Sequence, residues 1–244
     1  MTSEHLSAPD LHEIAPSLHR LRIPGDGAHL LNSYLWDGDD GVTLVDTGWP
    51  DSAALIESAL RVLGKGRGDV VRVVLTHFHE DHVGSAAEIA TWGRVEVVAG
   101  HADAAFVSGA ERGPLPVLTP AETEIHPPSD VPPHGPPCRV DRAVRDGDVL
   151  DFAGGARIVG APGHTPGSIA LHLPDADAVL TGDAVAEFHG TVILGAFNVD
   201  REEAKRSLAR IADTGASVAG FGHGEAVLDG AHALIRDAPD LLGA

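Results

Sequence analysis

The chain has 244 residues and is 43% hydrophobic, enough for a sizeable core in one large domain or two small ones. Its 36 acidic residues outnumber its 17 basic residues, which gives a formal charge of −19. A surface this acidic repels phosphate backbones and anionic lipids, so we expect neither nucleic acid nor a membrane as a partner. Cys138 is the single cysteine, which excludes an intrachain disulfide and a cysteine-based zinc site.

Short apolar runs alternate with helical patterns along the first hundred residues. A helix is expected over 51–64, with Asp51 as its N-cap and Gly64 at its end, and a second helix over 82–92. The turn at 37–41 favours a hairpin between its flanking strands. Strands are expected over 18–24, 30–36, 42–48, 70–77 and 95–101.

The second half of the chain repeats this mixture. Helices are expected over 200–215 and 230–237, and the strands lie within 148–163, 168–174, 178–186 and 217–224. Because each half begins with strands and then mixes strands with helices, we expect two sheets packed on each other with helices outside. No linker separates independent parts, so residues 1–244 are expected to form one domain.

The stretch from 108 to 137, called the proline-rich segment below, interrupts this regular pattern. It contains nine prolines and no sustained periodicity, so we predict an extended loop inserted into the domain. Such a loop is usually functional or disordered, and a surface insertion without a role is the alternative. If it passes over a binding site, Leu115 and Leu118 are its candidate substrate contacts.

No signal for export or membrane insertion is visible in the sequence. Residues 1–13 have neither the basic nor the apolar region of a signal peptide. No apolar run approaches the roughly 20 residues that cross a bilayer. We therefore expect a cytoplasmic protein.

The densest group of ionisable residues lies in "THFHEDHVGS", residues 76–85, between a buried strand and a helix. Burying so many ionisable groups is costly without a cation or partners. Three later stretches also place a histidine or an aspartate beside glycine at the end of an apolar strand; alone, each would more often be an ordinary core, surface or turn residue. Imidazole and carboxylate suit zinc, iron and manganese. The candidate metal ligands are His77, His79, Asp81, His82, His164, Asp183 and His223.

This pattern resembles the metallo-β-lactamase superfamily. The resemblance is carried by the HxHxDH motif at 77–82, by "VDTG" at 45–48 and by "PGHTPGS" at 162–168, and it covers nearly the whole chain. It implies an α/β fold of the four-layer αββα sandwich type and a site for two divalent metal ions, zinc foremost, with iron or manganese as alternatives. In this site His77, His79 and His164 would hold one ion, Asp81, His82 and His223 the other, and Asp183 would bridge them.

The implied chemistry is hydrolysis. Two ions roughly 3.5–4 Å apart lower the pKa of a shared water and polarise a carbonyl. The resemblance therefore implies a hydrolase whose metal-bridging hydroxide attacks a small ester, thioester or lactone. Asp81 is assigned a catalytic role besides ligation, and Asp46 would support the metal loop through hydrogen bonds. Glu80 should point away, and His189 is a candidate substrate contact.

Single positions argue against several branches of the superfamily. Diiron flavoproteins have a glutamate in place of His79, and the best-known secreted zinc β-lactamases have a cysteine in place of Asp183. Nucleic-acid-cleaving members need a basic docking surface. The related lactonases have a tyrosine at the position of Ala186, and glyoxalase II usually has a C-terminal helical domain, for which the 21 residues after His223 are too few.

What remains resembles the group of glyoxalase II, thioesterases and lactonases that has a bridging aspartate. Two alternatives stay open: a mononuclear iron oxidoreductase of the persulfide dioxygenase type, and a non-catalytic metal-binding protein. We expect a small-molecule substrate, and the sequence indicates neither its identity nor the oligomeric state.

Overall fold

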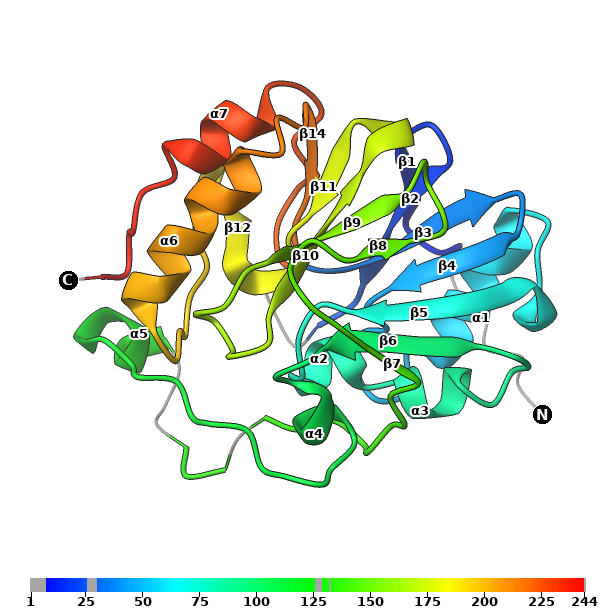
Figure 1. Cartoon of the computed structure of the whole chain (residues 1–244), viewed down its shortest axis with the longest axis horizontal. Coiled ribbons are helices and arrows are strands. Elements are labelled where there is room, and N and C mark those ends of the chain that lie inside the picture. Colours follow the sequence, from blue (N-terminus) through cyan, green and yellow to red (C-terminus); the bar gives the residue numbers. More distant parts are fainter. Residues whose placement is uncertain (1–7, 26–29, 126–128, 132, 244) are drawn as a thin grey trace.

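A computed structural model of the chain describes residues 8–25, 30–125, 129–131 and 133–243, and two β-sheets dominate it (Figure 1). The first sheet has the strand order β1-β2-β3-β4-β5-β6-β7 and the second the order β14-β11-β10-β9-β8, while β12 and β13 form a separate hairpin. In the first sheet the strands are β1 (Leu11–Ala15), β2 (Leu18–Ile23), β3 (Leu31–Gly38), β4 (Gly41–Val45), β5 (Val70–Leu75), β6 (Glu96–Gly100) and β7 (Arg142–Val144). The others are β8 (Val149–Leu150), β9 (Ala156–Gly160), β10 (Ile169–Leu173), β11 (Ala178–Leu180), β12 (Val185–Phe188), β13 (Thr191–Leu194) and β14 (Val218–Gly220).

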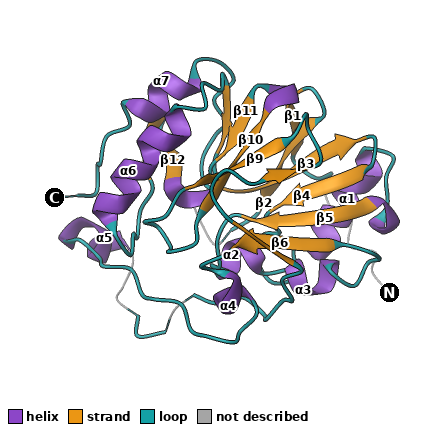
Figure 2. Ribbon diagram, in the orientation of Figure 1, coloured by secondary structure: helices purple, strands orange, loops and turns teal. Residues whose placement is uncertain are grey.

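Helices cover the outer face of each sheet (Figure 2). The helices of the structure are α1 (Ala53–Val62), α2 (Glu80–Val83), α3 (Ala86–Ile89), α4 (Ala104–Val107), α5 (Pro120–Ile125), α6 (Arg201–Ala212) and α7 (Ala231–Arg236), of which α5 lies in the proline-rich segment, away from the sheets. None of the helices in the described ranges is long and apolar enough to cross a membrane.

Three apolar clusters fill the spaces between the layers. Successive side chains of a strand point to opposite faces, and β5 shows this clearly. Val73 packs outward in a cluster with Ile56 of α1, whereas Val74 packs inward with Leu171 of the second sheet. The third cluster lies outside the second sheet and contains Ile211 of α6. The αββα sandwich expected from the sequence is therefore confirmed.

Two helix predictions need correction. Helix α1 begins at Ala53, and Ser52 rather than Asp51 occupies its N-cap position. Asp51 lies before the helix with a left-handed φ of 74°. The single helix expected over 82–92 is two short helices, α2 and α3. Between them the backbone N–H of Gly84 donates to the carbonyl of Gly48 at 2.9 Å, so this part of the chain is bound to the loop after β4.

The sequence pattern predicted an extended loop for the proline-rich segment, but the segment is not wholly extended. It contains the helix α5, and the residues at the start of this helix form a capping box. The backbone N–H of Glu122 donates to Thr119 Oγ1 at 3.1 Å, and the N–H of Thr119 donates to Glu122 Oε2 at 3.0 Å. Pro120 opens the helix, where its missing N–H has no intrahelical acceptor. Residues 126–128 and 132 of this segment lie outside the described ranges.

Sequence reasoning also missed helix α4, the edge strands β1 and β7, and the β12–β13 hairpin. All of these are short, and the two edge strands lie at the margins of the first sheet. The hairpin follows Asp183 directly and pairs Val185 with Leu194, so it borders the site described next.

Candidate metal centre

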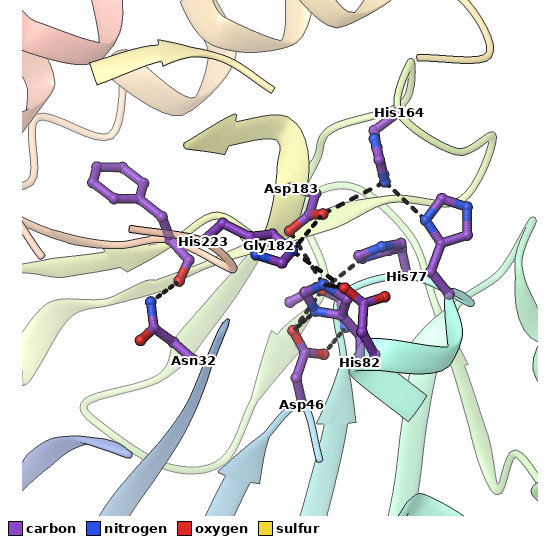
Figure 3. A network of polar contacts seen from close by, with 12 residues as sticks. Asn32, Asp46, His77, His82, His164, Gly182, Asp183 and His223 are labelled. Atoms are coloured by element: carbon purple, nitrogen blue, oxygen red, sulfur yellow. Dashed lines mark hydrogen bonds and ion pairs between the residues drawn. The ribbon is translucent and has the colours of Figure 1, made fainter. Parts of the chain in front are cut away.

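The seven candidate ligands meet at one edge of the sandwich, at the ends of strands from both sheets (Figure 3). In the first sheet, β4, β5 and β6 are parallel, so their carboxyl ends share one edge. In the second sheet, β11 and β14 are also parallel. Asp46 follows β4, and the loop from His77 to His82 follows β5. The second sheet contributes His164 from the loop between β9 and β10, Asp183 after β11 and His223 after β14.

The side chains form two groups, each with its ligand atoms within 4.8 Å of one another. His77, His79 and His164 form the first group. Asp81, His82, Asp183 and His223 form the second group.

Asp183 belongs to the second group by the distances between ligand atoms, but its carboxylate also faces the first group. Its Oδ2 is 3.8 Å from His164 Nε2 and 3.4 Å from His223 Nε2. Its Oδ1 is 3.2 Å from His82 Nε2. One carboxylate therefore reaches a histidine of the first group and two of the second, which is the placement that a bridging ligand requires.

Hydrogen bonds on the far side of three rings fix how the imidazoles are oriented. Nδ1 of His77 lies 3.1 Å from Thr76 Oγ1, and Nδ1 of His82 lies 2.8 Å from Asp46 Oδ2. Nδ1 of His164 lies 2.9 Å from the carbonyl of Ala196. With Nδ1 engaged, each ring presents Nε2 to the cluster, as metal-binding histidines usually do.

Asp46 makes the supporting contacts that the resemblance implies. The carboxylate is buried and accepts two hydrogen bonds from Thr76, one from its backbone N–H and one from its hydroxyl, both at 2.8 Å. It also holds His82 and has a left-handed φ of 59°. Asp46 thus joins the loop after β4 to the metal loop after β5.

The chemistry of the donor atoms fits a bound cation. Nε2 of His77 is buried and has no hydrogen-bond partner among the described residues. Nε2 of His82 and Oδ1 of Asp183 are also buried and, although 3.2 Å apart, do not meet hydrogen-bond geometry. Unpaired buried polar atoms are costly, and divalent ions bound by the two groups would satisfy all three. Nitrogen and oxygen donors of this kind suit zinc, iron or manganese.

The first group is electrically neutral. Burial lowers the pKa of His77 well below its ordinary value, and neighbouring histidines lower it further. Burial lowers the pKa of His79 to about 3, and it also lowers the pKa of His164. Neutral imidazoles keep a lone pair free, which is the form that binds a metal ion.

The second group combines cations with anions. Burial acts to lower the pKa of His82, but the carboxylates of Asp183, Asp81 and Asp46 raise it well above its ordinary value. The same opposition raises the pKa of His223 to about 10. Burial acts to raise the pKa values of Asp81 and Asp183, and the adjacent histidines hold both well below the ordinary range. A divalent cation would supply the positive charge that protons supply here.

The remaining predicted site residues lie outside both ligand groups. Glu80 is partly buried, and its backbone N–H donates to the carbonyl of Pro133 at 2.9 Å. His189 is exposed at the turn of the β12–β13 hairpin, where its ring packs on Phe188 with centroids 4.2 Å apart.

The proline-rich segment contacts the metal loop after β5 and the loop between β13 and α6. Near its start, Gly113 packs so closely on the ring of Phe78 that an added Cβ would lie 2.3 Å from it. Leu115 is 38% exposed and Leu118 is partly buried. Between them, the N–H of Val117 donates to the carbonyl of Asn198 at 2.9 Å, two residues from the carbonyl that orients His164. Leu115 and Leu118 therefore lie on a segment that borders the site.

Sequence reasoning missed the residues that hold the His223 loop in place. Nδ2 of Asn32, labelled in Figure 3, donates to the carbonyls of Phe221 and Gly224, both at 2.9 Å. The hydroxyl of Tyr34 donates to the Phe221 carbonyl at 2.7 Å. Tyr34 is buried, and burial raises the pKa of its hydroxyl. The signal was present in the sequence, since Asn32, Ser33 and Tyr34 form a polar interruption in the apolar run at 30–36.

Comparisons with known proteins agree with this geometry. The sequence profile of the metallo-beta-lactamase superfamily matches residues 27–223. The chain is 28% identical over 202 residues to the probable metallo-hydrolase YflN of Bacillus subtilis, and the match covers 74% of each protein. It is 32% identical over 139 residues to a hydroxyacylglutathione hydrolase of Brucella anthropi, which covers 56% of this chain but only 40% of that protein. A crystal structure of a metallo-beta-lactamase family protein from Thermus thermophilus matches with a TM-score of 0.67 and 29% identity, over 92% of this chain and 77% of that one.

Proposed function

Because this chain belongs to the metallo-beta-lactamase superfamily, we propose that it is a dinuclear metal-dependent hydrolase that cleaves a small ester, thioester or lactone. The observation that carries the proposal is the division of seven buried or partly buried ligands into two groups with Asp183 between them. When bound, two divalent ions would supply Lewis acidity to the substrate carbonyl and lower the pKa of a water.

Each residue of the candidate site has a separate role in this proposal. The three neutral histidines of the first group would hold one ion, and Asp81, His82 and His223 would hold the other, with Asp183 placed between the two groups. Asp46 keeps His82 in the orientation that presents Nε2. Asp81 is partly exposed, so we assign it a second role as the carboxylate that orients the attacking water.

The complete second group distinguishes this proposal from its alternatives. A mononuclear iron oxidoreductase of the persulfide dioxygenase type needs only one group of ligands. Here the second group has two carboxylates and two histidines whose atoms lie within 4.8 Å. A protein that only binds metal would not need a bordering segment with apolar side chains such as Leu115 and Leu118.

The substrate class is supported by the relatives and by the surroundings of the site. One relative is a hydroxyacylglutathione hydrolase, whose name describes thioester hydrolysis, although the match covers less than half of it. The related lactonases use a tyrosine near the bridging aspartate, but Tyr34 is buried behind the His223 loop. A thioester or simple ester is therefore favoured over a lactone.

A substrate screen with metal control tests the proposal. The protein would be loaded separately with zinc, iron and manganese and offered a glutathione thioester, an acyl ester, a lactone and a phosphodiester. We expect hydrolysis of at least one carbonyl substrate, its loss after chelation and its recovery when metal is returned. A metal-loaded protein that hydrolyses none of them, or that consumes oxygen with a persulfide, would contradict the proposal.

A further inference from the structure

A buried carboxylate outside both ligand groups connects the loops that carry the first group. Asp103 is fully buried between β6 and α4. Its Oδ2 accepts a hydrogen bond from the hydroxyl of Thr165 at 2.6 Å, and its Oδ1 accepts one from the backbone N–H of Gly167 at 2.7 Å. The backbone N–H of Phe78 also donates to this carboxylate.

These donors come from the two loops that must meet to hold the first metal ion. Phe78 lies between His77 and His79, and Thr165 directly follows His164. The metal loop follows a strand of the first sheet, whereas the His164 loop belongs to the second sheet. Asp103 therefore fixes the backbone next to all three ligands of the first group from a single side chain.

Two glycines allow this close approach. A Cβ on Gly167 would lie 2.2 Å from the backbone nitrogen of Asp103. A Cβ on Gly100 would lie 1.9 Å from the carbonyl oxygen of Gly167. The end of β6 and the His164 loop are thus packed at backbone distance, so a small shift of either would move His164.

Helix stability does not explain why an aspartate stands here. Asp103 occupies the N-cap position of α4, but its side chain makes no capping hydrogen bond to that helix. Burial raises the pKa of Asp103 to about 6, so its ionised form at neutral pH is held at a cost to folding stability. The hydrogen bonds of this carboxylate go to the two metal-binding loops and not to its own helix. On the His164 loop, its partner Thr165 is also hydrogen-bonded to Ser168.

We propose that Asp103 is a positioning residue that sets the distance between His164 and the His77–His79 pair, and thereby the affinity for the first metal ion. This inference rests on the metal site of the proposed function. It assigns Asp103 no contact with substrate or metal. Hydrogen-bonded residues behind metal ligands typically change metal affinity by about 10–100-fold when removed.

The test compares zinc affinity with the stability of the metal-free protein. Asp103→Asn keeps the shape but can accept through one oxygen only, and Thr165→Val removes one of the bonds at nearly constant volume. We expect zinc affinity at the tighter site, measured by chelator competition, to fall about 10–100-fold in Asp103→Asn and by a smaller factor in Thr165→Val. The melting temperature of metal-free Asp103→Asn should stay within about 4 °C of wild type. The reason is that the ionised carboxyl of Asp103 already lowers the folding stability of the wild-type protein.

Asp141→Asn is the matched control. Its carboxylate accepts the N–H of Val97 at 2.9 Å, at the opposite end of β6 and away from both metal-binding loops. We expect zinc affinity in this variant to equal that of wild type.

Several outcomes would overturn the inference. Wild-type zinc affinity in Asp103→Asn would do so, as would an equal loss in Asp141→Asn. If Asp103→Asn does not fold, unchanged affinity in Thr165→Val would have the same meaning. Zinc binding is measured without any substrate, so a protein that binds zinc but hydrolyses nothing would refute the proposed function and leave this inference standing. A wild-type protein that binds no zinc would refute both.

Discussion

Gly222, which precedes His223, leaves no room for a methyl group beside the second group of ligands. A Cβ at this position would lie 2.0 Å from Asp183 Oδ1 and 2.7 Å from His82 Cε1. The φ of Gly222 is not left-handed, so its backbone conformation tolerates alanine. The consequence of Gly222→Ala therefore comes from the contact alone.

The size of the effect follows from that contact. Real Cβ atoms essentially never approach another atom closer than 3.0 Å, so the carboxylate of Asp183 must move by about 1 Å. A misplacement of about 1 Å at a reacting centre costs on the order of 100-fold in rate. We expect Gly222→Ala to lower kcat/KM by about 100-fold and to destabilise the fold by about 1–3 kcal/mol through overpacking.

The assay combines hydrolysis with zinc titration, and Gly93→Ala is its control. A Cβ on Gly93 would meet nothing within 4 Å, and its φ is not left-handed either. Gly93→Ala should therefore retain wild-type activity and two zinc ions. If Gly222→Ala also keeps wild-type activity and zinc affinity, the reasoning about the second group is wrong.

Three further experiments test other parts of the account. Asp183→Ala should lower both zinc affinity and activity at least about 10-fold, whereas Glu80→Ala, outside both ligand groups, should change each far less; equal losses would contradict the assignment. Replacing residues 114–118 with Gly/Ser should raise KM by about 10-fold through lost apolar contact and leave metal content intact; an unchanged KM would make the segment a surface insertion. Glu122→Gln removes the buried carboxylate partner of Arg201, so the free energy of unfolding in urea should fall by about 2 kcal/mol, and no change would refute that role.

Most of the candidate metal site can be predicted from the sequence because its candidate ligands obey a local rule. His164, Asp183 and His223 each follow an apolar run and stand beside glycine. Such a pattern indicates a strand that ends in a tight loop, and parallel strands bring their carboxyl ends to one edge of a sheet. The strands and the sandwich follow from the same apolar runs.

The errors come from contacts between distant parts of the chain. A helical pattern over 82–92 gives no sign that Gly84 donates to Gly48, the contact at which the helix is interrupted. Helix α5 is different, because the residues of its capping box, Thr119 and Glu122, can be recognised in the sequence. It was missed because the surrounding prolines favoured the prediction of a loop.

Asp103 marks the limit of local reasoning. An aspartate just before a short helical run is typical of an N-cap, and Asp103 does occupy that position. Its actual partners, Thr165 and Gly167, are 62 and 64 residues away in the sequence. No local pattern links these positions, so only the folded structure shows the connection.

Metal content per chain tests the central claim most directly. The wild-type protein and two variants, His77→Ala in the first group and His223→Ala in the second, would be dialysed against zinc and measured by elemental analysis. The account predicts two ions per chain in wild type and one in each variant, because the two groups bind separate ions. One ion per chain in wild type at saturating zinc, or two ions in both variants, would contradict it.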